Sequence, residues 1–372
     1  MAKAARKAGK STALVSFYLS DDETLIFWLD SSSLDTRFER VAVSRGEIKE
    51  AATMLNDLFS KEQINCERPE HTTDMEWLEP LGHKLLEPLR SRLENHQCLV
   101  ISPHGELHSL PLHLLSPEGE PPLGTTHSIT FVANLSLYAL LLSRYSATKE
   151  SFSIPSLCLA TAACEDTQTV RESFALNPRS YASRTGGVFL EGIQATWTTF
   201  RKYAESAASI YLSCHGCFNE EDSLGSTLLL SNGKSLPSQV DTDHVLYELS
   251  VRDILQLRIR SRLVILDACM SGVQHFSPGD EPMGFSTAFL LSGANAVIAS
   301  NWSVEQRRAR FFMEKLQDIW SNAGVTLGQA MREAYAVTRS KYPHPYHWGG
   351  FSLIGNDRLL FTHSYREGVN HE

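Results

Sequence analysis

The sequence predicts an α/β protein whose mostly parallel sheet is flanked by helices. Residues 262–267 (RLVILD) and 296–300 (AVIAS) are continuous apolar runs, and a helical pattern over 283–292 separates them. Strands that are apolar along their whole length are buried on both faces, which is typical of parallel sheets covered by helices. No repeat of fixed period and no low-complexity tract interrupts this alternation of strand and helix patterns.

The first half of the chain already contains this alternation. Residues 13–19 and 24–30 alternate and carry β-formers, so they predict a hairpin around Asp21–Glu23. Beyond the hairpin, the spacing of apolar residues predicts helices over 44–62, 74–95 and 134–145, and a buried strand over 97–102.

A polar stretch of small residues at 146–153 separates the two halves, and the pattern then starts again. We therefore expect two α/β units, over residues 1–150 and 151–372. In the second unit the sequence predicts strands at 155–161, 209–214, 262–267 and 296–300, helices at 189–207, 250–258, 283–292, 305–321 and 326–340, and hairpins turning at Asn232–Gly233 (227–236) and at Asn356–Asp357 (350–362).

Composition excludes several classes of protein. The net charge is 34 − 43 = −9, a poor match for a protein that binds nucleic acid directly. Seven cysteines spread over 372 residues do not suggest a disulfide framework. The apolar run at 13–19 is too short for a signal peptide, and no run approaches the ~20 residues of a membrane-spanning helix. We expect a cytoplasmic protein with reduced thiols and no membrane contact.

Two strand ends in the second half carry a base and a thiol. His215 follows the predicted strand at 209–214, and Cys269 follows the one at 262–267. Catalytic groups gather outside the carboxyl ends of parallel strands. The separation, 269 − 215 = 54 residues, fits caspase-type cysteine peptidases, whose His lies about 50 residues before the Cys.

The residues at these two strand ends suit a mechanism in which a cysteine thiolate is the nucleophile. A free thiol has a pKa of about 8.5, so a neighbouring imidazole is a sufficient activator for Cys269. Gly216 has no Cβ and allows the backbone to approach a substrate carbonyl closely. Its N–H and that of Cys269 are candidates for an oxyanion hole. This chemistry requires no cofactor and no metal.

At this point the sequence resembles a known family. Five segments carry the resemblance: 99–115 (LVISPHGELHSLPLHLL), 211–217 (YLSCHGC), 263–272 (LVILDACMSG), 284–304 (GFSTAFLLSGANAVIASNWSV) and 346–355 (YHWGGFSLIG). Together they are similar to the CHAT family, which belongs with caspases, metacaspases and separases. The resemblance implies a caspase-like fold in two tandem units, an inactive pseudo-protease over 1–150 and an active protease over 151–372.

The same resemblance implies an endopeptidase that acts on a protein substrate. Asp267 lies two residues before Cys269, as in the D-x-C-x-S-G run of metacaspases, which implies cleavage after Arg or Lys. Many relatives carry helical-repeat or sensor domains that are not found in this sequence. We therefore expect a latent enzyme that a separate activating or sensor protein switches on. A role in bacterial antiviral defence or regulated cell death is a hypothesis from the family alone.

Other motifs have two interpretations each. Trp302 follows the strand at 296–300 and either lines the substrate pocket or only packs. Cys214 and Cys217 form a C-x-x-C, but no second ligand pair follows at zinc-finger spacing, so we predict no metal site. His104-Gly105 repeats the His-Gly dipeptide without a cysteine at a matching distance, and we assign His104 a structural role.

Two other functions stay open on the sequence alone. One is a scaffold or binding protein that uses a caspase-like fold with little catalysis. The other is a cysteine hydrolase of small amides. Nucleophile turns of the glutaminase type favour Gly before the Cys, whereas this chain has Ala268, and this difference argues against an amide hydrolase.

Overall fold

Eleven strands form one central sheet. The computed structural model describes residues 11–65, 72–147, 152–162, 168–219, 222–233, 246–268, 272, 275–277 and 281–361. Within these residues the strands lie in the order β3 (Thr36–Val41), β2 (Thr24–Asp30), β1 (Thr12–Leu19), β4 (Cys98–Ser102), β5 (Ser128–Phe131), β16 (Phe351–Gly355), β15 (Ala296–Ser300), β12 (Leu263–Asp267), β8 (Ser209–Ser213), β6 (Leu157–Ala160) and β7 (Val188–Glu191).

The sheet consists of two parallel blocks that run in opposite directions. β1, β4, β5 and β16 are parallel to one another. β15, β12, β8, β6 and β7 are also parallel to one another, and the two blocks meet where β15 and β16 pair antiparallel. β2 and β3 extend the first block as an antiparallel ribbon. The prediction of a mostly parallel sheet is confirmed.

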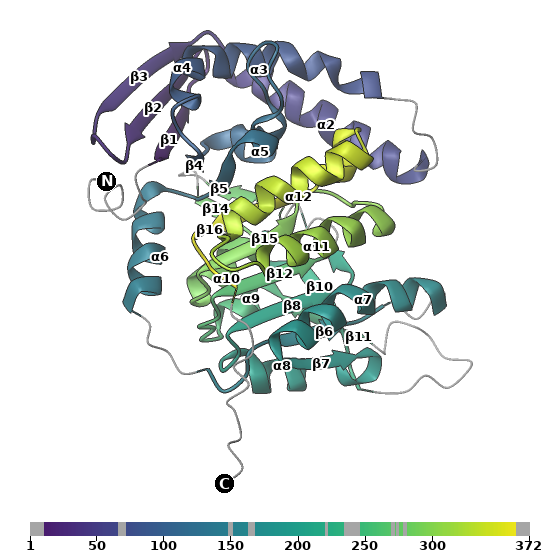
Figure 1. Ribbon diagram of the computed structural model, residues 1–372. Helices are drawn as coiled ribbons and strands as arrows, with labels where there is room; N and C mark the ends of the chain where they lie inside the picture. The colour runs from purple at the N-terminus through teal and green to yellow at the C-terminus, as the bar shows by residue number, and fades with distance from the viewer. Residues whose placement is uncertain are drawn as a thin grey trace.

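Helices cover both faces of this sheet (Figure 1). Successive strand residues alternate between the two layers, as Ile265 and Leu266 do, because side chains of a strand point to opposite faces. One face packs against α2 (Arg45–Asn65), α3 (Glu79–Leu86), α7 (Gln168–Thr185), α11 (Gln306–Trp320) and α12 (Leu327–Lys341), and the other against α6 (Leu135–Ala147), α8 (Trp197–Ala204), α9 (Val251–Leu255) and α10 (Phe285–Ser292).

Shorter elements complete the fold. They are η1 (Thr72–Leu78), η2 (Glu87–Leu89), α4 (Arg90–Leu93), η3 (Gly105–Ser109), η4 (Leu112–Leu114), α5 (Leu123–Thr126), η5 (Gly192–Gln194), η6 (Ser223–Gly225), α13 (Pro345–Trp348), a sheet of β9 (Gly216–Cys217), β10 (Thr227–Ser231) and β11 (Leu246–Ser250), and a pair of strands β13 (His275–Ser277) and β14 (Glu281–Met283).

The helix predicted over 189–207 is partly wrong. Its first residues form strand β7, which pairs with β6, and Gly192 then leaves the strand with a φ of +55°. Helix α8 begins only at Trp197, where the Thr196 side chain accepts the N–H of Thr199 in a capping box.

The prediction of one continuous helix over 74–95 is also wrong. It is broken into η1, α3, η2 and α4, with a proline in the first turn of both α3 and η2.

The two hairpins predicted in the second half have different outcomes. Strand β10 exists and its last residue, Ser231, pairs with Leu246 of β11, while residues 234–236 of the predicted hairpin lie outside the described residues. After β16 the chain does not fold back on that strand. Leu360 instead forms a bridge with Thr326, next to the start of α12.

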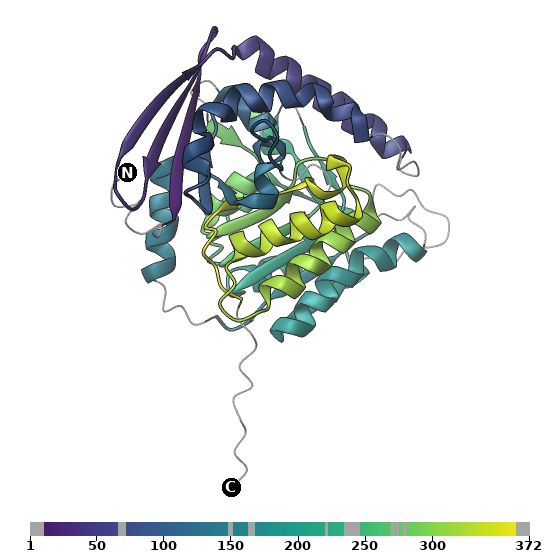
Figure 2. The ribbon, with the colours of Figure 1, turned by 45° about the horizontal axis from the view of Figure 1, so that its top comes forward.

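The boundary predicted at residue 150 falls between α6 and β6. The strands before it form β1 to β5, and those after it form the rest of the central sheet, so the two halves meet at the β5–β16 pair. Figure 2 shows β1, β2 and β3 at the outer end of this sheet, with α2 running across the same side of the molecule. The division into a pseudo-protease and a protease unit stays a prediction.

Candidate active site

Two parallel strands bring the predicted catalytic segments to one edge of the sheet. β8 and β12 are paired in register, with Ser213 opposite Asp267. His215 lies two residues after Ser213, and Cys269 lies two residues after Asp267. Because neighbouring strands are about 4.8 Å apart, the equal offsets make both segments start from adjacent points of the same sheet edge.

His215 is half-buried between the end of β8 and the start of β9. Its ring meets the ring of Phe174, from α7, edge-on with 4.9 Å between the centroids. Its carbonyl oxygen accepts the N–H of Leu229 at 2.9 Å, and the next residue, Gly216, pairs with Leu228 of β10. These contacts fix the backbone of the His-Gly dipeptide on both sides of the imidazole.

Cys269 lies outside the described residues, but both flanks of its loop are described. Ala268 follows β12 directly and is buried. The N–H of Gly272 donates to the carbonyl oxygen of Ser300 at 2.7 Å, at the end of β15. A Cβ at position 272 would lie 2.9 Å from that oxygen, so this close approach requires glycine. Ala268 therefore lies at the end of β12, and Gly272 lies beside the end of β15.

Asp267 ends β12 beside a buried tyrosine. Tyr211 Oη donates to Asp267 Oδ2 at 3.3 Å, and the ring of Tyr181 packs edge-on against that of Tyr211. Burial raises the pKa of Asp267 to about 6, and the hydrogen bond from Tyr211 opposes this shift. In the described part of the chain no basic side chain contributes to this pKa, so the carboxyl group lacks a counter-ion there.

Ser213 is a further candidate site residue, which the sequence alone did not suggest. Its side chain lies on the same face as Asp267, because directly opposed residues of paired strands point the same way. It is 1% exposed, and its hydroxyl group has no hydrogen-bond partner among the described residues. The signal that was available is its position two residues before His215, which matches the position of Asp267 before Cys269.

Trp302 follows β15 by two residues and is buried. Its Nε1–H donates to the carbonyl oxygen of Tyr346 at 3.0 Å, and its ring lies 4.2 Å from the ring of Phe59, centroid to centroid. It also lines a cavity. Trp302 therefore packs against Phe59 and also borders this cavity, while its role in binding a substrate stays a prediction.

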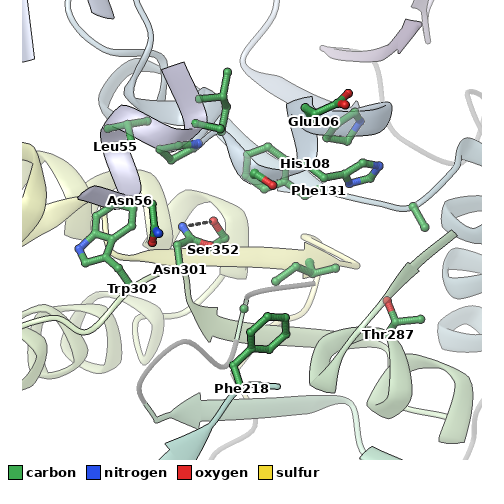
Figure 3. Close-up of a pocket in the computed structure, with 18 of the residues that line it drawn as sticks. Leu55, Asn56, Glu106, His108, Phe131, Phe218, Thr287, Asn301, Trp302 and Ser352 are labelled. Carbon is green, nitrogen blue, oxygen red and sulfur yellow. Dashed lines mark hydrogen bonds between the residues drawn. The ribbon is translucent and has the colours of Figure 1, made fainter. Parts of the chain in front are cut away.

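A cavity of about 400 Å³ lies between the two halves of the chain (Figure 3). Phe218 and Gly272, each three residues beyond a candidate catalytic residue, lie on its wall. Asn301 Nδ2 donates to Ser352 Oγ at 2.8 Å on the same wall. The first half contributes Leu55, Asn56, Phe59, Glu106, His108 and Phe131, and the second half contributes Thr287, Leu290, Trp302 and Ile354.

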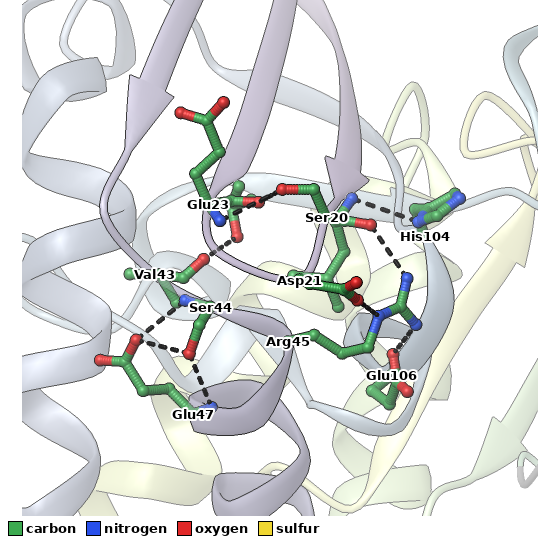
Figure 4. Close-up of polar contacts among 11 residues, drawn as sticks. Ser20, Asp21, Glu23, Val43, Ser44, Arg45, Glu47, His104 and Glu106 are labelled. Carbon is green, nitrogen blue, oxygen red and sulfur yellow. Dashed lines mark hydrogen bonds and ion pairs between the residues drawn. The ribbon is translucent and has the colours of Figure 1, made fainter.

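His104 has a structural environment. Its Nδ1 accepts the N–H of Leu19 at 3.2 Å, and its ring lies 4.6 Å from that of Tyr18 (Figure 4). The neighbouring Arg45 donates to Leu19 O at 3.0 Å and pairs with Glu106 at 2.6 Å. These bonds join the start of α2 to β1 and η3. The contacts agree with the structural role predicted for His104.

Cys214 and Cys217 have different surroundings. Cys214 is buried in the core below α8 and α9, whereas Cys217 is exposed. Within the described residues no group of three or more His, Cys, Asp or Glu side chains is arranged to hold a metal ion. The described cysteines, Cys98, Cys158, Cys214 and Cys217, are all free thiols.

With the fold and the strand-end geometry established, sequence comparison assigns the family. A model described as the CHAT domain matches residues 76–356, which include both candidate catalytic residues. The chain belongs to the CHAT domain family. The resemblance predicted from the five motifs is confirmed.

Curated relatives of this CHAT domain are much longer proteins. Tetratricopeptide repeat protein 28 of Mus musculus is 32% identical over 116 residues, which are 30% of this chain and 5% of the relative. The same protein of Homo sapiens is 30% identical over 132 residues, which are 35% of this chain and 5% of the relative. The CHAT chain therefore matches only a small part of each relative.

A solved structure shares the fold over nearly the whole CHAT chain. The separase–securin complex of Saccharomyces cerevisiae superposes with a TM-score of 0.63, at 10% identity, over 95% of this chain and 31% of that chain. A second structure of the same complex gives a TM-score of 0.59. This likeness supports the predicted caspase-like α/β fold.

Among the described helices, none is long and apolar enough to cross a membrane.

Proposed function

We propose that this CHAT protein is a cysteine endopeptidase in which Cys269 is the nucleophile and His215 the general base. The supporting observation is that Ser213 and Asp267 are paired in register. His215 lies two residues after Ser213, and Cys269 lies two residues after Asp267. In a parallel sheet such offsets direct the two segments to one edge, where a thiol and an imidazole work together.

The chemistry follows from these two side chains. His215 accepts the thiol proton, and the thiolate attacks the scissile carbonyl carbon to form a tetrahedral oxyanion. The N–H groups of Gly216 and Cys269 stabilise that oxyanion. When it collapses, the imidazolium gives its proton to the leaving amine and an acyl-thioester remains. Water, deprotonated by His215, then hydrolyses the thioester and regenerates the thiol.

We propose Asp267 and Ser213 as the floor of the pocket for the residue before the scissile bond. Among the described residues, the hydroxyl group of Tyr211 is the hydrogen-bond partner of the Asp267 carboxyl group, and the Ser213 hydroxyl group faces the same side. A guanidinium or ammonium group supplies both a counter-charge and hydrogen-bond donors. The proposed substrate is therefore a protein segment with Arg or Lys before the cleaved bond.

Latency and a protein partner complete the proposal. The separase structures that share this fold are complexes with securin, and a regulatory protein partner is proposed here by analogy. The free thiols among the described cysteines support a reducing compartment, for which we propose the cytoplasm. A role in bacterial antiviral defence is proposed from the family alone, with a second protein as substrate.

The test uses the chain both alone and in a lysate of the source cells, which supplies the proposed activator. The probes are a fluorogenic peptide that ends in Arg and an arginine-based acyloxymethyl ketone that alkylates activated thiols. We expect Cys269→Ala and His215→Ala to abolish cleavage. Wild-type protein should be alkylated at Cys269, while His215→Ala is not. Cys217→Ser, which removes an exposed thiol, is the matched control and should behave as wild type.

Two results would contradict the proposal. Cleavage retained by Cys269→Ala would exclude this nucleophile. Absence of alkylation at Cys269 in wild-type protein, both alone and in a lysate of the source cells, would favour a scaffold that uses the fold without catalysis. Cleavage of small amides but of no protein in a mass-spectrometric screen would favour an amide hydrolase.

A further inference from the structure

The central sheet ends in a strand that is paired on one side only. β3 is the first strand of the sheet and pairs with β2 alone among the described strands. Figures 1 and 2 both place it at the outer end of the molecule. The free side of an edge strand presents unpaired N–H and C=O groups, to which another strand can bind.

Three aromatic rings are exposed on one face of this ribbon. Tyr18 is 49% exposed, Phe27 45% and Phe38 48%. Phe27 and Phe38 are directly opposed in the β2–β3 register, and their ring centroids lie 5.2 Å apart. Helix α6 packs on the same face further along, over residues such as Leu14, but leaves these rings exposed. Exposed apolar patches of this kind are typical of protein–protein interfaces.

The other face of β3 carries opposite charges on either side of Phe38. Glu39 pairs with Arg92 of α4 at 2.7 Å, which holds its carboxylate at the edge. Arg37 makes no ion pair within the described residues, and its guanidinium group donates to the carbonyl oxygen of Thr36 at 3.2 Å. A carboxylate accepts several hydrogen bonds, so Glu39 can hold Arg92 and a second guanidinium group together.

We propose that β3 pairs antiparallel with β3 of a second copy of this chain, with the two-fold axis at Phe38. Phe38 then lies against the partner's Phe38 and continues the aromatic row. On the other face, Arg37 lies opposite the partner's Glu39, and this pair occurs twice because the interface is symmetric. The surface lies in the N-terminal half, so the dimer does not depend on the proposed peptidase activity.

The charge pattern of the strand selects this register over its neighbours. A two-fold axis at Arg37 would place Arg37 against the partner's Arg37. An axis at Glu39 would place two carboxylates against each other. Like charges directly opposite one another destabilise a strand pair. Among these three registers, only the axis at Phe38 brings opposite charges together and also stacks the exposed rings.

A charge-exchange experiment tests the proposal in analytical ultracentrifugation of the full chain. We expect wild type to form a reversible dimer as its concentration rises. Arg37→Glu and Glu39→Lys should each raise the dissociation constant at least about tenfold, because each variant opposes like charges. An equimolar mixture of the two variants should dimerise again, since the carboxylate introduced at position 37 of one chain then faces the ammonium group introduced at position 39 of the other.

Two controls separate this interface from loss of folding or from another surface. Glu191→Lys makes the same charge change on β7, at the opposite edge of the sheet, and should leave dimerisation unchanged. Arg92→Gln removes the intrachain partner of Glu39 and should still dimerise. Circular dichroism should show that every variant is folded. A wild type that stays monomeric, or a mixture that does not recover, would overturn the proposal.

Cross-linking measures the register directly. Residues opposed in an antiparallel pair have Cα atoms about 4.5–5.5 Å apart, which suits a disulfide. We expect Phe38→Cys to give a covalent dimer under mild oxidation. Phe27→Cys lies one strand inward on the same face, about 14 Å from its symmetry mate, and should not. Equal cross-linking of the two variants, or none of Phe38→Cys, would contradict the axis at Phe38.

Discussion

The ring of Phe59 lies against that of Trp302, with centroids 4.2 Å apart and planes inclined by 34°. Phe59 belongs to α2 in the N-terminal half, whereas Trp302 follows β15 near the candidate active site. The start of α2 is held by the ion pair between Arg45 and Glu106. The contact therefore ties the segment after β15 to a helix that is anchored in the other half of the chain.

If this contact restrains a latent enzyme, Phe59→Ala should raise basal peptide cleavage by about fivefold or more. The same change should lower the free energy of unfolding by about 3–5 kcal/mol, because it removes a buried ring. Cleavage assays and urea denaturation measure the two effects. Leu85→Ala, a buried position of α3 in the same core, is the control: it should lower stability without raising activity.

Gly272 lies three residues after Cys269, the proposed nucleophile, and closely approaches the end of β15. In Gly272→Ala the new Cβ would lie 2.9 Å from the carbonyl oxygen of Ser300, so the loop must shift. A displacement of about 1 Å at a catalytic group costs about a hundredfold in rate, and we expect kcat to fall by that order. Gly46→Ala is the control, because its Cβ has ordinary space, 3.7 Å from Ser44 Oγ. An unchanged kcat in Gly272→Ala would contradict this role.

The sequence identified the central strands because their apolar runs are continuous. Leu263–Asp267 and Ala296–Ser300 are buried on both faces, so hydrophobicity alone distinguishes them. β3 was missed because Thr36–Val41 is mostly exposed and carries three charged residues among six. β7 was missed because its four residues were joined to the helix that follows. β5 was also missed, although it is central and mostly buried, because Ser128 and Thr130 interrupt its apolar pattern. Local patterns thus identify the strands with a continuous apolar run, and they fail at the edges of the sheet and at β5.

The candidate site also contains residues that local sequence patterns indicate and residues that only the structure brings together. His215 and Asp267 could be proposed from the sequence because each follows or ends an apolar strand, which is a local signal. Ser213 gains its significance only from its register with Asp267, which depends on the pairing of two strands 54 residues apart. Phe59 meets Trp302 across 243 residues of sequence, 302 − 59, and no local pattern announces such a contact. Relationships between distant strands and helices therefore required the structure.

Ser213 should contribute to recognition of a basic side chain. We expect Ser213→Ala to lower kcat/KM for peptides ending in Arg about tenfold to a hundredfold, which corresponds to the loss of one hydrogen bond to a charged group. Stability should change little, because the hydroxyl group has no partner within the described residues. Ser286→Ala removes another buried, unpartnered hydroxyl group, in α10, and should leave kcat/KM unchanged. Equal effects of both variants would count against the pocket assignment.

If Asp267 lines the proposed substrate pocket, the preference for Arg should depend on pH. Its pKa is raised from 3.8 to about 6, so the carboxyl group is neutral well below pH 6 and charged above it. The quantity to measure is the ratio of kcat/KM for a peptide ending in Arg to that for its citrulline analogue. This ratio should rise as pH increases through about 6, because only the ionised carboxylate attracts the guanidinium group. Titration of the proposed catalytic residues changes kcat/KM for both peptides by the same factor, so its effect cancels in the ratio.

Replacement of Asp267 isolates that titration. Asp267→Asn keeps the size of the side chain but cannot ionise, so the ratio should become independent of pH between about 5 and 8. It should also fall by about a hundredfold at pH 8, where a buried charge pair would be lost. If the ratio of wild type were flat across pH 6, or if the variant retained the preference for Arg, Asp267 would not face the substrate cation. Its carboxyl group would then serve only the hydrogen bond with Tyr211.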